Sequence, residues 1–209
     1  MPPIHRIPHT VAMEALNHAL FLQINAAPTL PHWLIAVSLL IANDLIFAVP
    51  LTLAGMWLAS GDKRREAALR AAFVASIALG INQLIGMVWY HPRPFVIGLG
   101  HTFMPHAPDS SFPSDHVTLL SAVACTLLYN RQRLPGALVL GIAIAVAWAR
   151  VFVGVHYPFD VIGAACVGWV VYLLTAPLWK RIGAPLSRMV IDAYRKLLAR
   201  PIGHGWLRA

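Results

Sequence analysis

Long apolar stretches separated by short polar segments dominate the chain. Residues 33–59 are apolar apart from Asn43 and Asp44, and four further stretches follow: 67–90, 115–130, 134–153 and 159–179. Because about 20 apolar residues cross a bilayer as a helix, the pattern predicts an all-α, polytopic membrane bundle of about five to six spans. The first stretch fits one tilted or broken span better than two, and Pro50 predicts a kink in it.

Two amphipathic segments flank these stretches. In residues 11–25, Leu16, Leu20 and Ile24 recur at helical spacing, and the segment is too short and polar to span comfortably. It predicts a helix lying at the membrane interface. Residues 186–200 are basic and are expected on the cytoplasmic surface. We therefore expect one membrane domain in three parts: an interfacial N-terminal helix, a transmembrane catalytic core and a basic cytoplasmic tail (1–30, 31–180 and 181–209).

Composition agrees with a membrane protein. Of the 209 residues, 58% are hydrophobic and 11% are charged, whereas soluble domains carry about 25% charged residues. Cys125 and Cys166 lie inside apolar stretches, so we interpret them as small buried hydrophobes and not as a disulfide or metal pair. The N-terminus lacks the apolar region of a cleaved signal peptide, so insertion is expected to depend on the spans.

The net charge of +8 comes from clusters beside the ends of apolar stretches. The clusters are Lys63, Arg64, Arg65 and Arg70; Arg131 and Arg133; and Lys180 through Arg208. The positive-inside rule places such clusters in the cytoplasm, and this distribution argues against a nucleic-acid partner. The 91–114 segment, the 150–158 connection and the N-terminal helix are then all expected on the outer face.

Arg93 and Arg150 are placed against the positive-inside rule. Guanidinium groups bind phosphate oxygens through paired, charge-assisted hydrogen bonds, which would explain two arginines at the outer face. Alternatively, each arginine pairs structurally with Asp109 or Asp115. On their own, the two interpretations are evenly balanced.

Two nearby motifs favour phosphate. In FPSDH, Ser114 is a good helix N-cap and Asp115 and His116 fall in the first turn. A helix N-terminus with free N–H groups and a serine hydroxyl is suited to binding an anion. In GVHYPFD, Asp160 lies four residues after His156 and is close enough to orient its ring. This spacing is typical of a nucleophile and its orienting group.

The motifs resemble those of the type 2 phosphatidic acid phosphatase (PAP2) superfamily. That family has a Lys-then-RP segment, a PSGH-like segment and an SR…H…D segment; this chain has HPRPF, PSDH and ARVFVGVHYPFD in the same order. Three coordinated motifs are far more specific than one. The resemblance is strongest to the bacterial undecaprenyl-diphosphatase branch, and it extends to ALFLQIN near the N-terminus and GHGWLRA at the end.

The resemblance implies a role for each matching residue. His156 would attack the terminal phosphoryl group and form a phosphohistidine, while Asp160 would hold its tautomer. His116 would protonate the departing lipid oxygen and then activate water. Four residues would bind the phosphoryl oxygens: Arg93, Ser114, Arg150 and the backbone of Asp115.

Besides Asp115 in place of the family's glycine, two positions lose a polar side chain of the family pattern. The family lysine is replaced by Gly86 and the serine before Arg150 by Ala149. Gln83 or His91 is the suggested substitute for the lysine.

Asp44 and the loop histidines are further candidates. An acid inside a span is costly, so Asp44 is expected to support the pocket, to pair with an arginine, or to be neutral and hydrogen-bonded to Asn43. His91, His101 and His106 lack a Cys or acid at ligand spacing. We therefore expect no metal and no cofactor.

The implied reaction is hydrolysis of undecaprenyl diphosphate to undecaprenyl phosphate and phosphate, at the periplasmic face of the bacterial cytoplasmic (inner) membrane. It would serve carrier-lipid recycling in cell-wall biogenesis and bacitracin resistance. Phosphatidylglycerophosphate or phosphatidate phosphatase is the alternative, because the motifs bind only the shared phosphoryl group. A transporter would place ionisable residues near the midplane, often with repeats, and the similar vanadium haloperoxidases are soluble and keep the lysine. The oligomeric state stays open.

Overall fold

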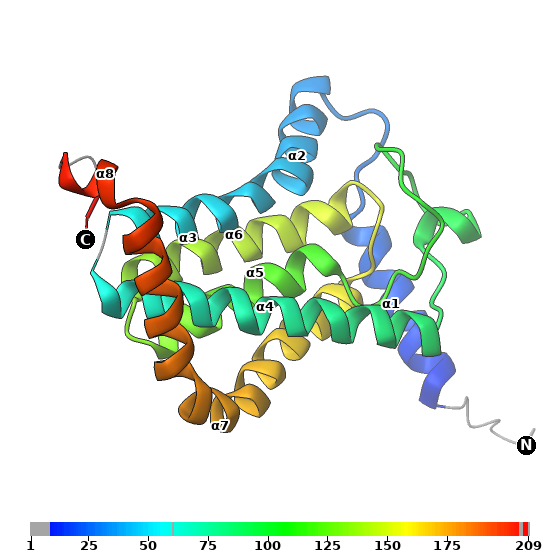
Figure 1. Cartoon of the computed structure of the whole chain (residues 1–209). Coiled ribbons are helices and arrows are strands. Elements are labelled where there is room, and N and C mark those ends of the chain that lie inside the picture. Colours follow the sequence, from blue (N-terminus) through cyan, green and yellow to red (C-terminus); the bar gives the residue numbers. More distant parts are fainter. Residues whose placement is uncertain (1–8, 60, 205–206, 209) are drawn as a thin grey trace, which may run out of the picture.

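Helices form all the regular structure in the described residues of the computed structural model, which are 9–59, 61–204 and 207–208 (Figure 1). They are α1 (His9–Ile24), α2 (His32–Asp44), the 3-10 helix η1 (Leu45–Phe47), α3 (Ala48–Leu58), α4 (Asp62–Val88), the 3-10 helix η2 (Pro94–Ile97), α5 (Asp115–Tyr129), α6 (Arg133–Phe152), α7 (Pro158–Leu197) and α8 (Ala199–Gly203). The all-α membrane bundle is confirmed. Parts of the predicted N-terminal segment and tail lie outside the described residues.

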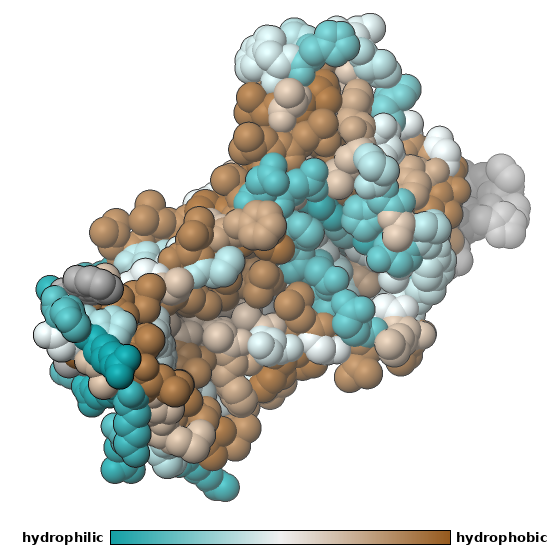
Figure 2. Space-filling view, turned by 45° about the horizontal axis from the view of Figure 1, so that its top comes forward, coloured by the Kyte–Doolittle hydropathy of each residue, from teal (hydrophilic) through white to brown (hydrophobic). Residues whose placement is uncertain are grey.

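Among the described residues, four helical segments are long and apolar enough to cross a membrane: 32–58, 62–88, 133–152 and 158–197. The span predicted at 115–130 corresponds to α5, whose 15 residues extend only about 22 Å at 1.5 Å per residue. α5 packs against α4, α6 and α7 and lies at the centre of the bundle (Figure 1). A helix enclosed on three sides does not need to match the bilayer thickness. Hydrophobic side chains cover the middle of the molecular face in Figure 2, and hydrophilic ones gather towards its two ends.

The first span was expected to be either tilted or broken, and it is broken. The break does not lie at Pro50 itself. The helix is interrupted by η1, and Pro50 lies in the first turn of α3. A proline lacks an N–H and clashes with the carbonyl four residues earlier, which is Ile46 in η1. The proline therefore accounts for a break just before it. Figure 1 shows α2 leaving the line of α3 and standing away from the bundle.

Small residues allow α4, α5 and α7 to approach closely. α4 buries one face made of alanines: Ala67, Ala68, Ala71, Ala75 and Ala78. On α7, a Cβ at Gly168 would lie 2.8 Å from the backbone nitrogen of Ala122 in α5. Small residues at helix contacts are typical of membrane bundles, where close backbone approach supplies the van der Waals attraction.

α7 continues beyond its expected end at residue 179. It contains Pro177 and Pro185, and Figure 1 shows it bending so that its second half crosses the start of α4. Arg195 of that half pairs with Asp62 at 2.9 Å. The predicted boundary between the core and the 181–209 tail therefore falls inside α7, which runs without interruption from Pro158 to Leu197. The first basic cluster, which begins at Lys63, lies within a helix and not in a loop before the 67–90 stretch, because α4 already begins at Asp62.

Four helix ends meet at the opposite end of the bundle. α4 and α6 end there, at Val88 and Phe152, and α5 and α7 begin there, at Asp115 and Pro158 (Figure 1). The polar 89–114 segment folds over these ends and hydrogen-bonds to the connection after α6, for example from Phe103 N to Val153 O at 3.1 Å. This arrangement brings the three sequence motifs together.

α1 packs on the same end through a stripe that the apolar pattern did not predict. Asn17 and Phe21 are buried, and the Phe21 ring lies edge-on to Tyr157 at 5.5 Å between centroids. Leu16, from the predicted apolar stripe, is half exposed instead. Further exposed apolar residues on this helix are Val11, Met13 and Leu22. Its free surface is therefore apolar, as expected for a helix at a membrane interface.

Gly154 lies where the 89–114 segment contacts the connection between α6 and α7. Its φ is +88°, and a Cβ there would overlap the carbonyl oxygen of His101. Both backbone conformation and space therefore require glycine.

We expect Gly154→Ala to destabilise the protein by more than the about 1–3 kcal/mol of left-handed strain alone, because the new methyl group also displaces the His101 carbonyl. Gly98→Ala is the matched control, since φ is +71° there and a Cβ would meet nothing within 4 Å. Thermal unfolding in detergent measures both. Equal losses of stability in the two variants would contradict the close contact at Gly154.

Candidate active site

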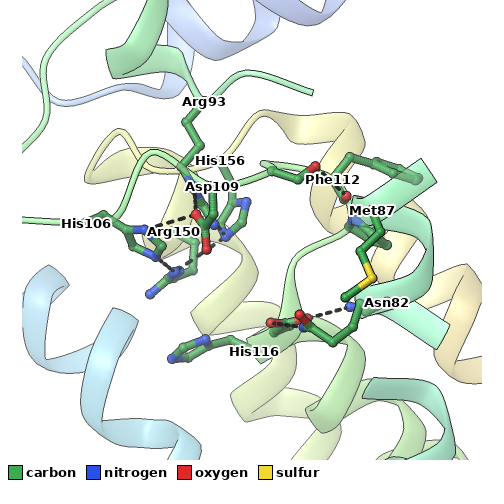
Figure 3. A pocket seen from close by; sticks show the side chains of 14 residues that line it. Asn82, Met87, Arg93, His106, Asp109, Phe112, His116, Arg150 and His156 are labelled. Carbon is green, nitrogen blue, oxygen red and sulfur yellow. Dashed lines mark hydrogen bonds and ion pairs between the residues drawn. The ribbon is translucent and has the colours of Figure 1, made fainter. Parts of the chain in front are cut away.

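The sequence motifs surround a cavity of about 270 Å³ at the meeting point of the helix ends (Figure 3). Its lining comes from α4, the 89–114 segment, the start of α5, the end of α6 and the connection to α7. The residues are Asn82, Gln83, Gly86, Met87, Arg93, His106, Asp109, Ser110, Phe112, Pro113, Asp115, His116, Arg150 and His156. The cavity thus unites candidates that lie up to 74 positions apart (82 to 156).

His156 lies in the connection between α6 and α7 and is 2% exposed. Its Nδ1 donates to the carbonyl oxygen of Ser111 at 2.9 Å. Its Nε2 accepts from Arg93 Nη1 at 3.3 Å and from Arg150 Nη2 at 3.4 Å. Since both guanidinium groups only donate, this arrangement requires a neutral ring with its proton on Nδ1 and its lone pair on Nε2.

Asp160 stands behind His156, in the first turn of α7. One carboxylate oxygen, Oδ2, accepts from the backbone N–H of Tyr157 at 2.7 Å and from the Ser111 hydroxyl. The same oxygen lies 3.6 Å from His156 Nδ1, which is longer than a hydrogen bond. The direct partner of the ring is therefore Ser111, and Asp160 acts at slightly longer range. Sequence reasoning missed Ser111.

The two arginines are buried but differ in their partners. Arg93 is 5% exposed; its Nε donates to Asp109 at 2.8 Å and its Nη1 to Val155 O at 2.8 Å. The structural pairing that we kept open for Arg93 therefore exists. Arg150 is 2% exposed, and among the described residues it has no carboxylate in ion-pair contact, while its Nε lacks any hydrogen-bond partner. A buried cation without a counter-ion is costly unless an anion binds there.

The N-terminus of α5 contributes three residues. His116 lines the cavity on the side opposite His156 and Arg93 (Figure 3). Ser114 occupies the N-cap position and is fully buried, and its Oγ has no hydrogen-bond partner among the described residues. Asp115 is exposed, and its carboxylate accepts from Asn82 at 2.9 Å and from Gln83 at 3.1 Å. Two amides thus hold the acid that replaces the family's glycine.

The three supporting candidates have different positions. Gln83 lines the cavity beside Gly86, but its amide is engaged by Asp115. His91 does not line this cavity; it lies on the far side of Asp160. Asp44, at the end of α2, is exposed and does not line the cavity, so its position gives no support to a pocket role.

His106 and Asp109 are cavity residues that we had taken for ordinary loop positions or structural partners. His106 Nε2 accepts from Arg150 at 3.1 Å, and its Nδ1 donates to Ala107 O at 3.1 Å. Burial lowers the pKa of His106 below its usual value, and the nearby Arg93 and Arg150 lower it further. No sequence signal identifies them, because they lie in an irregular segment whose path depends on the tertiary fold.

Within the described part of the chain, no three His, Cys, Asp or Glu side chains are arranged to hold a metal ion. Two arginines and two carboxylates, Asp109 and Asp115, line the cavity. Asp109 accepts from Arg93, and Asp115 accepts from Asn82 and Gln83, while Arg93 and Arg150 direct N–H donors at His156 in the cavity. Such a set of donors binds an oxyanion.

The PAP2 superfamily profile matches residues 67–183. "Putative undecaprenyl-diphosphatase YbjG" of Escherichia coli (strain K12) is 36% identical over 196 residues, covering 94% of this chain and 99% of the relative. "Undecaprenyl-diphosphatase BcrC" of Bacillus subtilis (strain 168) is 33% identical over 159 residues, covering 76% of this chain and 82% of the relative.

A similar fold occurs in the crystal structure of the first transmembrane PAP2 type phosphatidylglycerolphosphate phosphatase from Bacillus subtilis. The TM-score is 0.60 at 21% sequence identity, and the match covers 83% of this chain and 89% of that chain. At this identity the likeness concerns the fold alone.

The pKa of His156 provides a test of the site geometry. Burial lowers it to about 4, Arg150 and Arg93 also lower it, and Asp160 opposes the shift. Because the pKa is lowered, the ring stays neutral as the pH falls from 8 to about 5 and takes up a proton only near pH 4. We expect ¹⁵N NMR of histidine-labelled protein to show an unprotonated Nε2 and a protonated Nδ1 on His156 over that range. Titration near the ordinary value of about 6.5, or the opposite tautomer, would contradict the geometry.

Proposed function

Because the chain belongs to the PAP2 superfamily, we propose that it hydrolyses undecaprenyl diphosphate to undecaprenyl phosphate and inorganic phosphate, at the periplasmic face of the bacterial cytoplasmic membrane. Membership of this family and the relatives' diphosphatase names make the chain an enzyme with lipid phosphatase activity. The finer statements are our proposal: the substrate, the phosphohistidine intermediate and the orientation in the membrane.

One observation carries the proposal: the lone pair of a buried, neutral His156 points between two guanidinium groups at the cavity. A phosphoryl group bound by Arg93 and Arg150 would bring its phosphorus next to Nε2. The unpartnered Nε of Arg150 and Oγ of Ser114 offer further donors. Donors fixed before the substrate arrives stabilise developing charge without reorganisation.

In the first step, His156 Nε2 donates its lone pair to the terminal phosphorus and an N–P bond forms. The bond from that phosphorus to the bridging oxygen breaks, and the oxygen leaves with the lipid phosphate. His116, across the cavity, enters the step protonated and is the proposed donor of the proton that this oxygen takes up. Burial and the nearby Arg150 lower its pKa to about 3, and the negative charge of the bound diphosphate would favour the protonated ring. The positive charge on the phosphorylated ring is offset by Asp160 behind Nδ1.

In the second step, water attacks the phosphorus of the phosphohistidine. His116, now neutral, accepts the proton of the water as the new P–O bond forms. The N–P bond breaks and its electron pair returns to Nε2, which releases inorganic phosphate. The enzyme regains its starting protonation state, so the cycle requires no redox partner.

The side of the cavity formed by α4 suits a substrate with a lipid tail. Met87 lines the cavity and is 79% exposed, and its neighbours Leu84 and Val88 are also exposed. Exposed apolar side chains on a membrane helix face lipid, so a head group in the cavity has an apolar path for its tail. The undecaprenyl tail itself is proposed from the names of the two relatives.

Charge supports the periplasmic orientation. Lys63, Arg133 and Arg195 lie at the helix ends opposite the cavity, where the positive-inside rule expects the cytoplasm. Trp89 and Trp148, near the cavity end, are exposed aromatic residues of the kind that gather at a membrane–water interface.

Phosphate release from three lipids tests the substrate. We expect purified protein, with EDTA present, to prefer undecaprenyl diphosphate over phosphatidylglycerophosphate and phosphatidate. The reason is that the two relatives carry diphosphatase names. A preference for either glycerolipid would contradict the proposed substrate and leave the site chemistry in place.

Single substitutions test the assigned roles. We expect His156→Ala to abolish turnover and Arg150→Ala to lower kcat by about 10²–10³-fold, as for loss of an oxyanion donor. Arg188→Ala is the control, because Arg188 is exposed on the second half of α7. An Arg150→Ala rate within twofold of wild type, or clear residual turnover of His156→Ala, would rule out the corresponding role.

A further inference from the structure

A second cavity, of about 370 Å³, lies behind Asp160. It is lined by α1, the 89–114 segment and the start of α7, and most of its lining surface is apolar. The residues are Met13, Glu14, Asn17, Trp89, His91, Phe112, Phe159 and Asp160. Asp160 lines this cavity but not the first one, so its far side faces groups that the proposed reaction has not used.

His91 stands between two carboxylates in this region. Its Nε2 donates to Glu14 Oε1 at 3.2 Å, and its Nδ1 lies 3.8 Å from Asp160 Oδ1. Nδ1 is buried and has no hydrogen-bond partner among the described residues. Each ring nitrogen therefore faces one carboxylate, and a shift of about 1 Å would bring Nδ1 within hydrogen-bond distance of Asp160 Oδ1. Since carboxylates only accept, hydrogen bonds to both at once require a ring with a proton on each nitrogen.

The two oxygens of Asp160 have different surroundings. Oδ2 accepts from Tyr157 N and from the Ser111 hydroxyl, and it is the oxygen nearer His156. Oδ1 has His91 on its side. A buried carboxylate requires donors on both oxygens, so His91 is placed to satisfy Oδ1 and keep Oδ2 directed at the nucleophile.

The backbone of His91 is joined to the same unit. Its carbonyl accepts from Ser111 N at 2.7 Å, and its N–H donates to Ser110 Oγ at 3.2 Å. Ser111 in turn binds both His156 and Asp160. The main chain and the side chain of His91 therefore both contact one cluster, which consists of Ser111, His156 and Asp160.

α1 fixes this cluster from outside. Glu14 also contacts His18 at 3.0 Å, and the His18 ring stacks on Tyr157 at 5.2 Å. The buried Asn17 accepts from the N–H of Phe159, in the first turn of α7, at 3.0 Å. The helix that the sequence presents only as an interfacial element thus contacts Tyr157 and Phe159, which lie just before Asp160.

We propose that His91 is a positioning residue for the Asp160–His156 pair and that Glu14 of α1 fixes its ring, giving the chain Glu14–His91–Asp160–His156. The inference rests on the proposed function, because it assigns His91 a role in phosphoryl transfer from the lipid. His91 does not line the phosphoryl cavity, so it acts on the nucleophile through Asp160 and not on substrate binding.

The first experiment compares His91→Phe with His91→Asn on whichever lipid the wild type hydrolyses. Phenylalanine keeps the ring volume but removes both nitrogens, whereas asparagine keeps a donor close to the position of Nδ1. We expect His91→Phe to lower kcat about tenfold or more with KM within about threefold, the pattern of a lost transition-state interaction. His91→Asn should recover most of the loss, and His32→Phe, at an exposed histidine of α2, is the control.

The second experiment separates positioning from packing. In an Asp160→Asn background, His91→Phe should lower kcat less than about twofold further, because residues that act through one another are not additive. Glu14→Ala should lower kcat with KM unchanged, and it tests the same chain if thermal unfolding shows that His91→Phe does not fold.

Three results would overturn the inference: full kcat in His91→Phe, the same fold loss with and without Asp160, or full kcat in a folded Glu14→Ala. Absence of wild-type turnover on every lipid phosphate contradicts the proposed function instead. The two failures are therefore distinguishable.

Discussion

The site depends on one lone pair, that of His156 Nε2. The nitrogen is unprotonated, and its lone pair is directed at two buried guanidinium groups. Burial keeps the ring neutral by lowering its pKa to about 4, and the Ser111 carbonyl fixes the tautomer by accepting a hydrogen bond from Nδ1–H. Arg150 is buried without a carboxylate in contact among the described residues, a cost that a bound phosphoryl group offsets. In the proposed reaction, the same arrangement would prepare the nucleophile and select the anion.

The fold produces this arrangement by bringing helix ends together. α5 and α7 begin, and α4 and α6 end, at one end of the bundle, so the residues that follow or precede each helix meet in one place. Close contacts at the α4 alanines and at Gly168 allow α5 to lie enclosed at the centre, where its N-terminus faces the cavity. Hydrophobic side chains cover the middle of the bundle in Figure 2. The helix ends that carry Lys63, Arg133 and Arg195 lie at the end of the bundle away from the cavity.

Periodicity and motif spacing predicted the helices and the pocket residues that lie at helix ends, because both properties are local. His156, Arg93, Arg150 and His116 line one cavity as expected. Ser111, His106 and Glu14 could not be predicted, since their positions depend on how the irregular 89–114 segment and α1 fold over the helix ends. The length of α5 was misjudged for a related reason: an apolar run does not reveal whether lipid or other helices surround it. The expected end of the last span at residue 179 was also misplaced, because α7 bends there and continues into the basic segment as one helix (Figure 1).

The central claim is that phosphate passes through a covalent bond to His156 Nε2. The most direct test is rapid acid-free quenching of the enzyme during turnover of undecaprenyl diphosphate labelled with ³²P in the terminal phosphate, followed by peptide mapping. The account predicts transient, acid-labile label on the peptide that contains His156, appearing before free phosphate and absent from His156→Ala. Release of labelled phosphate at the full wild-type rate with no label on His156 at any time would contradict it.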